Sequence, residues 1–537
     1  MRPSLAGRLA VCIAPFTLIA CDGENTKAPA PETAVVRSSQ EPDSLNPFLT
    51  GMSVATDASQ PIYSGLLAVN EKMRFIPDLA LNVPTAENGG VQRHKKGMVV
   101  TYRLRPDVKW HDGVPFTSRD VAFTARILQD PRVQVVEREG YDLIERVETP
   151  SAHLVRIYFK EIYAPYLKLF RAVLPYHRLK DAPDINRAPF NRHPIGTGPY
   201  LLVDWRAGER LIYRANPHYF RGKPAIKNLE FRIVPDDNSA FVQLKNGAID
   251  VYQNVNLGQF RSLRQLKNVK VHQTPALLWE HLSFNLEKTF FQDVRVRKAI
   301  AHAIDKNMLS QKVYEGLWKP AWCDQNPLSW AYAPSLENKT PYDPQEAQRL
   351  LDEAGWKRGP DGIRLKNGER FSVSFATTAG RKTRETSQLL IRHFLRAVGI
   401  EVVIDNHPGV TLFAAWPQGL LKGGKFDMAM WAWDTGPDPD NLNTWHSQRI
   451  PPKGGNQTRY KNPEVDHLLE SATRTFEQAE RQKIYRRVST ILADDLPNIP
   501  LLYWTVLDLV QDRLEGFRPN PTNAGNLWNV YEWRLKK

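Results

Sequence analysis

Short β-rich runs alternate with clearly bounded helices along most of the chain, and this alternation constrains the fold more than any other feature. Runs typical of strands occupy residues 99–104, 154–159, 211–214, 229–233 and 500–510. The pattern predicts an α/β protein in which helices cover a sheet. Because 537 residues exceed what one hydrophobic core supports, we expect about three structural units.

Capping residues mark the helix starts. Asp343, Asn462 and Asp293 each precede a segment whose apolar residues recur at helical spacing, and the first two are followed by a proline that suits the first turn. Thr117 and Asp120 have the spacing of a capping box. We expect these helices to pack the fold rather than to carry chemistry.

The first twenty residues are predicted to be a signal peptide. Arg2 and Arg8 precede an apolar run at residues 9–20. This run is shorter than the roughly 20 residues needed to span a bilayer, but its length is typical of a signal-peptide core. The run ends in LIAC at residues 18–21, which resembles the bacterial lipobox and implies cleavage before Cys21 and lipidation of its sulfur. Ordinary secretory cleavage beside an incidental cysteine is the alternative.

Residues 21–33 follow as a polar, proline-bearing tether. The mature protein is therefore predicted to be exported, periplasmic and anchored to a bacterial membrane through lipid on Cys21, and Asp22 favours the inner membrane face. Of the 3 cysteines, Cys12 would leave with the signal peptide and Cys21 would carry lipid, so Cys323 would have no partner for an internal disulfide. We expect Cys323 to be a buried small side chain.

Signatures of catalysis are missing from the sequence. There is no HExxH, GxSxG, GxxxxGKS/T, GxGxxG or paired CxxC motif, and the 13 histidines are scattered. We therefore expect a binding protein without catalytic residues, metal or cofactor, rather than a secreted hydrolase.

The net charge of +14 would suit a nucleic acid, but the basic residues are interspersed with acidic ones and form no long block. Removal of residues 1–20 takes away Arg2 and Arg8 and no acidic residue, which lowers the charge to +12. On an exported protein this excess favours an anionic membrane surface or acidic ligands, so no nucleic-acid partner is expected.

Six segments in a fixed order carry a family resemblance: LRPDVKWHDG at 104–113, GTGPY at 196–200, ANP at 215–217, GKP at 222–224, DVRVRKAI at 293–300 and NPEVD at 462–466. Together they resemble the extracellular solute-binding proteins of family 5, the peptide-binding receptors of ABC importers. The resemblance covers about residues 35–505. It implies a periplasmic-binding-protein-like type II fold, with two lobes, a hinge and an inserted extra domain. The glycines of GTGPY are expected where a strand turns sharply.

The resemblance also implies a division of the chain. Lobe I would comprise residues 34–65, 190–284 and 486–537, with the extra domain inserted at 66–189 and lobe II at 285–485. The chain would cross between the lobes near Asn285 and again at 496–503. Ligand would bind in the cleft and shift the protein towards its closed state.

The implied function is that of a monomeric receptor that captures peptides and delivers them to the permease subunits of an ABC importer. The alternative is a non-peptide ligand on the same fold, namely a nickel chelate, haem or an oligosaccharide. His446, beside Trp445, is the residue that would serve a metal complex.

Candidate ligand contacts follow the predicted strand 427–433. By the resemblance, Asp434 pairs with the ligand's α-ammonium, and Asp438 is its rival. The alternative is that Asp434 only caps or turns the loop. Trp431, Trp433 and Trp445 are candidates for an aromatic wall, with core packing as the alternative.

A ligand carboxylate is expected to meet Arg381, which follows the predicted strand 371–376. Arg384 is the next candidate, and a solvated basic loop is the alternative.

Overall fold

The computed structural model describes residues 32–255, 266–523 and 525–536. The predicted signal peptide, Cys21 and all but the last two residues of the tether lie outside this part of the chain. Strand β1 (Thr33–Ser38) begins where the tether was predicted to end. None of the described helices combines the length and the apolar character needed to cross a membrane.

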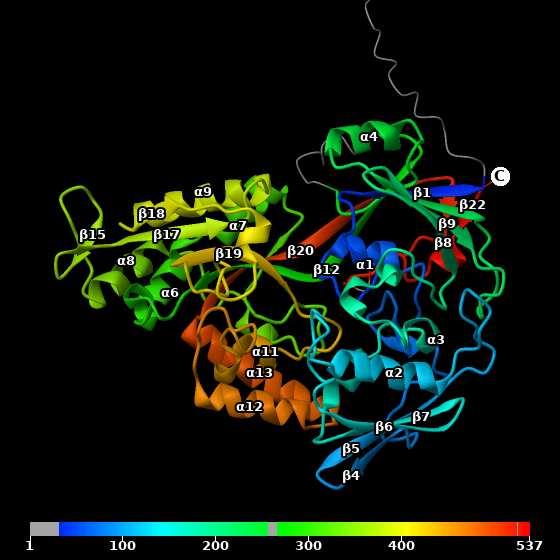
Figure 1. Ribbon diagram of the computed structural model, residues 1–537. Coiled ribbons are helices and arrows are strands. Elements are labelled where there is room, and N and C mark those ends of the chain that lie inside the picture. The colour runs from blue at the N-terminus through cyan, green and yellow to red at the C-terminus, as the bar shows by residue number, and fades with distance from the viewer. Residues whose placement is uncertain (1–31, 256–265, 524, 537) are drawn as a thin grey trace, which may run out of the picture.

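One mixed sheet runs through both halves of the molecule (Figure 1). Its strands, in spatial order, are β18 (Glu401–Ile404), β17 (Ser372–Thr377), β19 (Met428–Asp434), β12 (Val269–Phe284), β20 (Asn498–Gln511), β11 (Val251–Tyr252), β1, β10 (Asn228–Ile233), β9 (Arg210–Ala215) and β8 (Tyr200–Arg206). β13 (Lys319–Pro320) also pairs with β20. With helices packed on this sheet, the predicted α/β class is confirmed.

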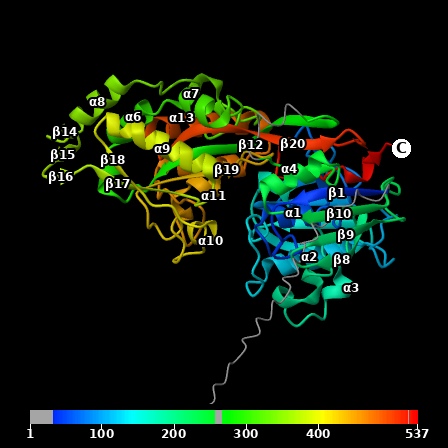
Figure 2. The same ribbon diagram turned by 90° about the horizontal axis from the view of Figure 1, so that it is seen from above.

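β12 and β20 connect the two halves (Figures 1 and 2). Their antiparallel register shifts between Pro275 and Trp279. On one side of this shift β20 pairs with β11, and on the other side β12 pairs with β19. The strand pairing therefore changes several residues before Asn285, where the chain was predicted to cross between the lobes. Residue 486, the predicted start of the last segment of lobe I, lies inside α13 (Gln478–Asp495). The lobe boundaries stay a prediction.

Helices cover both faces of the β17–β19 half. One face packs against α6 (Val294–Ala303), α7 (Lys306–Tyr314), α8 (Pro344–Glu353) and α9 (Lys382–Ala397). α11 (Leu442–Trp445), α12 (Pro463–Thr473) and α13 share a separate hydrophobic cluster with Trp279 and Tyr503. α10 (Gly409–Leu412) follows β18.

The other half holds α1 (Ser53–Ser59), α4 (Asp237–Lys245) and a smaller unit with its own sheet. That sheet has the order β4 (Val91–His94), β5 (Gly97–Arg103), β7 (Leu154–Phe159) and β6 (Ile144–Ser151), and α2 (Ser118–Gln129) and α3 (Tyr176–Leu179) belong to the same unit. Short pairs complete the fold: β2 (Leu67–Val69) with β3 (Phe75–Pro77), β14 (Lys357–Arg358) and β16 (Glu369–Arg370) with β15 (Arg364–Lys366), and β21 (Leu514–Glu515) with β22 (Arg534–Leu535).

The predicted helix caps are present. The side chains of Asp293, Asp343 and Asn462 accept hydrogen bonds from backbone N–H groups in the first turns of α6, α8 and α12. Thr117 and Asp120 form the capping box at the start of α2. The caps could be predicted from the sequence because a cap depends only on residues within one helical turn of each other.

Two of the family motifs pack against each other. His111 Nδ1 accepts the Gly196 N–H at 3.1 Å, so its Nε2–H donates to the Gly198 carbonyl at 3.1 Å. Burial lowers the pKa of His111 to about 4, which keeps the ring neutral in this arrangement. Neither glycine has a left-handed φ. An added Cβ would lie 1.8 Å from the Ile62 carbonyl oxygen at Gly196, so close backbone approach, rather than the predicted sharp turn, requires glycine.

We expect Gly196→Ala to destabilise the protein by about 3 kcal/mol or more, because backbone must shift to admit the methyl group. The measurement is the melting temperature of the full chain. Gly51→Ala is the matched control, since the nearest atom to its added Cβ is a Val136 methyl at 3.7 Å. Equal melting temperatures for the two variants would contradict the prediction.

Candidate functional site

The site is built at one edge of the β17–β19 half. β17 and β19 pair in parallel, with Thr377 opposite Met430. Their carboxyl ends therefore meet at the same edge of the sheet, where α/β folds commonly bind ligands. The loop that follows β19, residues 434–440, is called the acidic loop here because Asp434, Asp438 and Asp440 lie on it.

Asp434 is the last residue of β19, and its two carboxylate oxygens differ in hydrogen bonding. Oδ1 accepts the Gly436 N–H at 2.8 Å, which is the turn contact expected of an aspartate in a loop. Oδ2 is buried and has no hydrogen-bond partner among the described residues. Burial raises the pKa of Asp434, and the hydrogen bond from the Gly436 N–H opposes this only in part. A ligand cation at Oδ2 would satisfy this oxygen and restore the carboxylate.

Asp438 is held by an arginine. Arg481 of α13 forms a two-pronged ion pair with both of its carboxylate oxygens, at 2.7 and 2.8 Å, and both side chains are largely buried. The pair raises the pKa of Arg481. Asp438 therefore fastens the acidic loop to α13, and neither of its oxygens is left for a ligand amine.

Asp440 reaches across to the smaller unit. Its Oδ2 lies 3.1 Å from Lys168 Nζ, at the end of the 3-10 helix η1 (Ala164–Lys168). Glu139 lies 3.4 Å from the same Nζ. Burial and the charges of Asp440 and Glu137 raise the pKa of Glu139 to about 7, although Lys168 opposes them. The protonated form of Glu139 hydrogen-bonds to Asp440, so the three groups make a neutral bridge between the halves.

The predicted tryptophans separate into two environments. Trp431 is buried in a cluster with Leu412, Leu421 and Phe426, and Trp445 is buried in the cluster formed by α12 and α13. Trp433 is half-buried and contacts both clusters. Because side chains alternate along a strand, Trp431 and Trp433 lie on the face of β19 opposite to Asp434. The structure therefore does not bring the tryptophans together with the carboxylate.

His281 was not singled out by the sequence. It is fully buried on β12, with ring centroids 4.4 Å from Trp431 and 4.1 Å from Trp433. Neither ring nitrogen has a partner among the described residues, and burial lowers its pKa well below the usual value. Its only sequence signal was a histidine beside Glu280 in the apolar-rich second half of β12, residues 276–284.

The two arginines near the predicted carboxylate site differ in role. Arg384 forms a buried pair with Glu280 at 2.7 Å, and Glu280 also accepts the Trp504 indole N–H at 3.2 Å. Arg381 opens α9, is exposed and forms no ion pair with any carboxylate of the described chain. Its guanidinium lies 6.0 Å from the centre of the Trp504 ring. Asp434 is the last residue of β19, and Arg381 lies in the segment between the end of β17 and the start of α9, so both lie towards the carboxyl ends of these parallel strands.

His446 and Cys323 have structural partners. His446 Nδ1 accepts the Gln448 N–H at 3.1 Å, so Nε2–H donates to Glu470 at 3.1 Å. Within the described ranges no group of three or more histidine, cysteine or acidic side chains is placed to hold a metal ion. Cys323 is buried as predicted, and burial raises its pKa to about 12.

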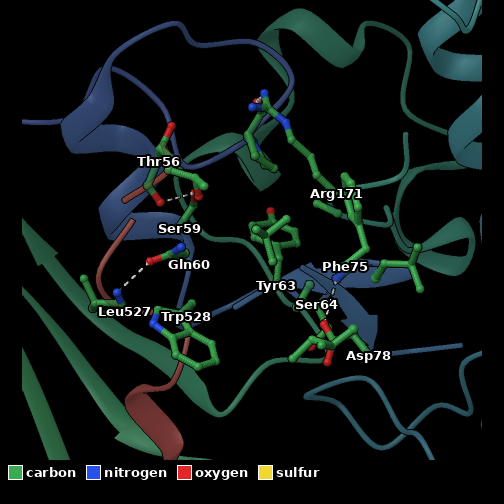
Figure 3. Close-up of a pocket in the computed structure, with 18 of the residues that line it drawn as sticks. Thr56, Ser59, Gln60, Tyr63, Ser64, Phe75, Asp78, Arg171, Leu527 and Trp528 are labelled. Carbon is green, nitrogen blue, oxygen red and sulfur yellow. Dashed lines mark hydrogen bonds between the residues drawn. The ribbon is translucent and has the colours of Figure 1, made fainter. Parts of the chain in front are cut away.

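Two cavities adjoin the acidic loop at Pro437. The larger, ≈ 710 Å³, lies between the halves and is lined by Leu277, Trp330, Gly436, Arg481 and residues of the smaller unit. The other, ≈ 240 Å³, extends into the half that contains α1 (Figure 3). The loop that carries Asp434 is therefore a wall of both.

Comparisons with known proteins agree on one family. The model of bacterial extracellular solute-binding proteins, family 5 (middle region), matches residues 74–450. The oligopeptide-binding protein AppA of Bacillus subtilis is 29% identical over 512 residues, covering 94% of this chain and 91% of that protein. Di/tripeptide-binding protein 2 of Pseudomonas aeruginosa is 28% identical over 561 residues, covering 99% of each.

Solved structures show the same architecture. AppA of B. subtilis in complex with a nonapeptide has a TM-score of 0.81 at 28% identity, covering 94% of this chain and 99% of that one. NikZ of Campylobacter jejuni in complex with Ni(L-His) has a TM-score of 0.81 at 26% identity, with the same coverage.

The bridge between the halves predicts a pH dependence. A carboxyl whose pKa is raised in the folded state binds a proton that the unfolded chain has already released, so stability falls as pH rises from about 4.5 to about 7. We expect Glu139→Gln to lose less stability than the parent between pH 5 and pH 8. The shift in pKa corresponds to on the order of 1–3 kcal/mol, or roughly 1–3 °C in melting temperature.

Glu145→Gln, which changes an exposed glutamate of the same unit, is the matched control and should follow the parent. Other titrating groups contribute equally to all three proteins. Parallel pH profiles for the parent and Glu139→Gln would contradict the prediction.

Proposed function

The chain belongs to family 5 of the bacterial extracellular solute-binding proteins, and we propose that it captures peptides beside the acidic loop and delivers them to the permease of an ABC importer. Its fold is the predicted type II periplasmic-binding-protein fold. The observation that carries the proposal is the buried Oδ2 of Asp434, which has no hydrogen-bond partner among the described residues. It belongs to the loop whose Gly436, Pro437 and Asp438 line a cavity of ≈ 710 Å³. AppA, which shares this fold, holds a nonapeptide.

Asp434 is the proposed anchor for the α-ammonium of the peptide. A charge-assisted hydrogen bond in a site shielded from water stabilises binding by about 1.5–3 kcal/mol. The same burial penalises a ligand without a positive charge, because the carboxyl group would remain unsatisfied. Asp438, the rival, is committed to Arg481, which supports Asp434 as the anchor.

Arg381 is the proposed contact for the ligand carboxylate. It supplies a guanidinium without an ion-pair partner in the described chain, at the sheet edge where Asp434 lies. Of the three tryptophans proposed as an aromatic wall, only Trp433 is half-buried, so only Trp433 is kept as a proposed ligand contact. It would meet the ligand from the face of β19 opposite to Asp434.

Closure is proposed to occur about β12 and β20, where their register shifts between Pro275 and Trp279. The bridge of Lys168, Asp440 and Glu139 then fastens the acidic loop to the opposite side. Because the loop begins at the amine anchor, ligand binding and closure act on one segment, which is how a bound peptide would shift the open–closed population.

The cellular setting extends the proposal. We infer a monomer without catalytic activity, exported to the periplasm and held at the inner membrane through lipid on Cys21. The lipobox-like sequence before Cys21 and Asp22 after it support this placement. A nickel complex, the alternative ligand, was linked to His446, whose two ring nitrogens are both hydrogen-bonded.

Isothermal titration of the soluble chain with alanine-rich tripeptides tests the anchor. We expect peptides with a free amino terminus to bind, and N-acetylated peptides to bind about 10–100-fold more weakly. Asp434→Asn should lose affinity for free peptides by a similar factor and should no longer distinguish the two forms.

Asp181→Asn, at an 85% exposed side chain, is the matched control and should bind as the parent does. The same titration with C-amidated peptides tests Arg381. We expect the parent to bind a free carboxyl terminus more tightly than an amidated one, and Arg381→Gln to bind both equally. Lys382→Gln is the control and should behave as the parent does. Equal binding of acetylated and free peptides would refute the amine anchor, whereas loss of discrimination in Asp438→Asn alone would favour its rival.

Lipidation is tested in cells by incorporation of labelled palmitate. We expect labelling of the parent and none of Cys21→Ser, because that thiol is the only acceptor in the lipobox-like sequence. Cys323→Ser is the control and should be labelled, since its own sulfur is buried. Continued labelling of Cys21→Ser would contradict the anchor.

A further inference from the structure

The smaller cavity beside the acidic loop, ≈ 240 Å³, is lined chiefly by apolar side chains (Figure 3). It lies between α1, the β2–β3 pair and residues 522–523 and 527–531 near the C-terminus, and Pro437 of the acidic loop borders it. Its apolar lining includes Leu67, Val69, Phe75, Leu169, Leu527 and Trp528. Such a lining stabilises an apolar group by removing it from water.

One polar group in the cavity is left without a partner. The side chain of Tyr63 projects into the space in Figure 3, and its hydroxyl is buried with no hydrogen-bond partner among the described residues. Neighbouring polar groups are engaged: Ser59 donates to the Thr56 carbonyl at 3.0 Å, and the Gln60 side-chain oxygen accepts the Leu527 N–H at 3.0 Å. A buried hydroxyl without a partner costs free energy that a ligand can recover.

The charges around the cavity are largely neutralised by one another. Asp78 pairs with Arg221 at 2.8 Å and accepts the Gly65 N–H. Lys168 pairs with Asp440. Arg171, at the exposed rim, donates to the Pro47 carbonyl at 2.7 Å. The guanidinium of Arg171 has no carboxylate partner in the described chain, but it lies at the exposed rim. The other charged groups that line the cavity, Asp78, Arg221 and Lys168, are paired. A charged ligand group placed inside, away from the rim, would be desolvated without a free counter-charge, so the interior suits an uncharged group.

The cavity lies within reach of the amine anchor. Pro437 is three residues from Asp434, and three extended residues span at most about 10 Å. A peptide held at Asp434 by its amino terminus can therefore place the side chain of one of its first three residues beneath Pro437.

We propose that this cavity is a specificity subsite for one uncharged aromatic or branched apolar side chain of the peptide, within its first three residues, with the Tyr63 hydroxyl as its polar contact. The inference rests on the proposed function and adds a side-chain preference to it. The subsite is also tied to closure, because Lys168 lines the cavity and fastens the acidic loop above it.

The test is a titration of the full soluble chain with tripeptides that carry Gly, Leu, Phe, Tyr, Lys or Glu at one position and Ala at the others. At one of the three positions we expect Phe, Tyr or Leu to bind at least about 10-fold more tightly than Gly, and Lys and Glu to bind no better than Gly. Ala68→Leu, which narrows the cavity, should reduce the Phe-to-Gly ratio below about 3-fold. Tyr63→Phe should lose any preference for Tyr over Phe.

Val203→Leu, a similar enlargement at a 54% exposed position of β8, is the matched control and should keep the parent's ratios. Three results would overturn the subsite. The parent could bind all side chains with equal affinity, it could bind Lys or Glu more tightly than Gly, or Ala68→Leu could leave the Phe-to-Gly ratio unchanged. If amine-dependent binding persists without a side-chain preference, only the subsite fails. If a folded parent binds no peptide at all, the proposed function fails with it.

Discussion

The antiparallel pairing of β12 with β20 is the constraint on which the rest of the structure depends. These strands keep main-chain hydrogen bonds through both halves, so the halves form one sheet rather than two domains on a flexible linker. The register shift between Pro275 and Trp279 interrupts the ladder at mid-length, where bending costs fewest hydrogen bonds. This interruption is where we propose that the angle between the two halves changes.

In the function proposed above, the acidic loop serves ligand binding and closure together. Its three carboxylates lie in three environments. Asp434 has one oxygen without a partner in the part of the chain that the structure describes, Asp438 pairs with a buried arginine, and Asp440 pairs with a lysine of the smaller unit. The two paired carboxylates hold the loop still, and a positioned loop is what makes the unpaired one selective. An unsatisfied carboxyl in a mobile loop would simply turn towards water.

Local signals were read correctly from the sequence because they act over one turn of chain. The caps of α6, α8 and α12 and the capping box of α2 are examples. Asp434 was predicted from the family resemblance, at the end of a strand that the alternation of residues 427–433 indicates, and its role stays a prediction. Lys168, Arg481 and His281 could not be found this way, since each gains its role from a residue far away in the chain. The tryptophans show the same limit, because alternation places two of them on one face but does not say what covers that face.

The sequence by itself determined the class of fold and the ordered family motifs, and it predicted the export signal and the loop in which we propose the amine anchor. Tertiary structure alone decided which aspartate of that loop is unpaired, which tryptophan is still accessible and that a second cavity adjoins Pro437. The physical reason is that pairing and burial depend on distances across the fold. Asp438 and Asp440 look as available as Asp434 until α13 and the smaller unit supply Arg481 and Lys168.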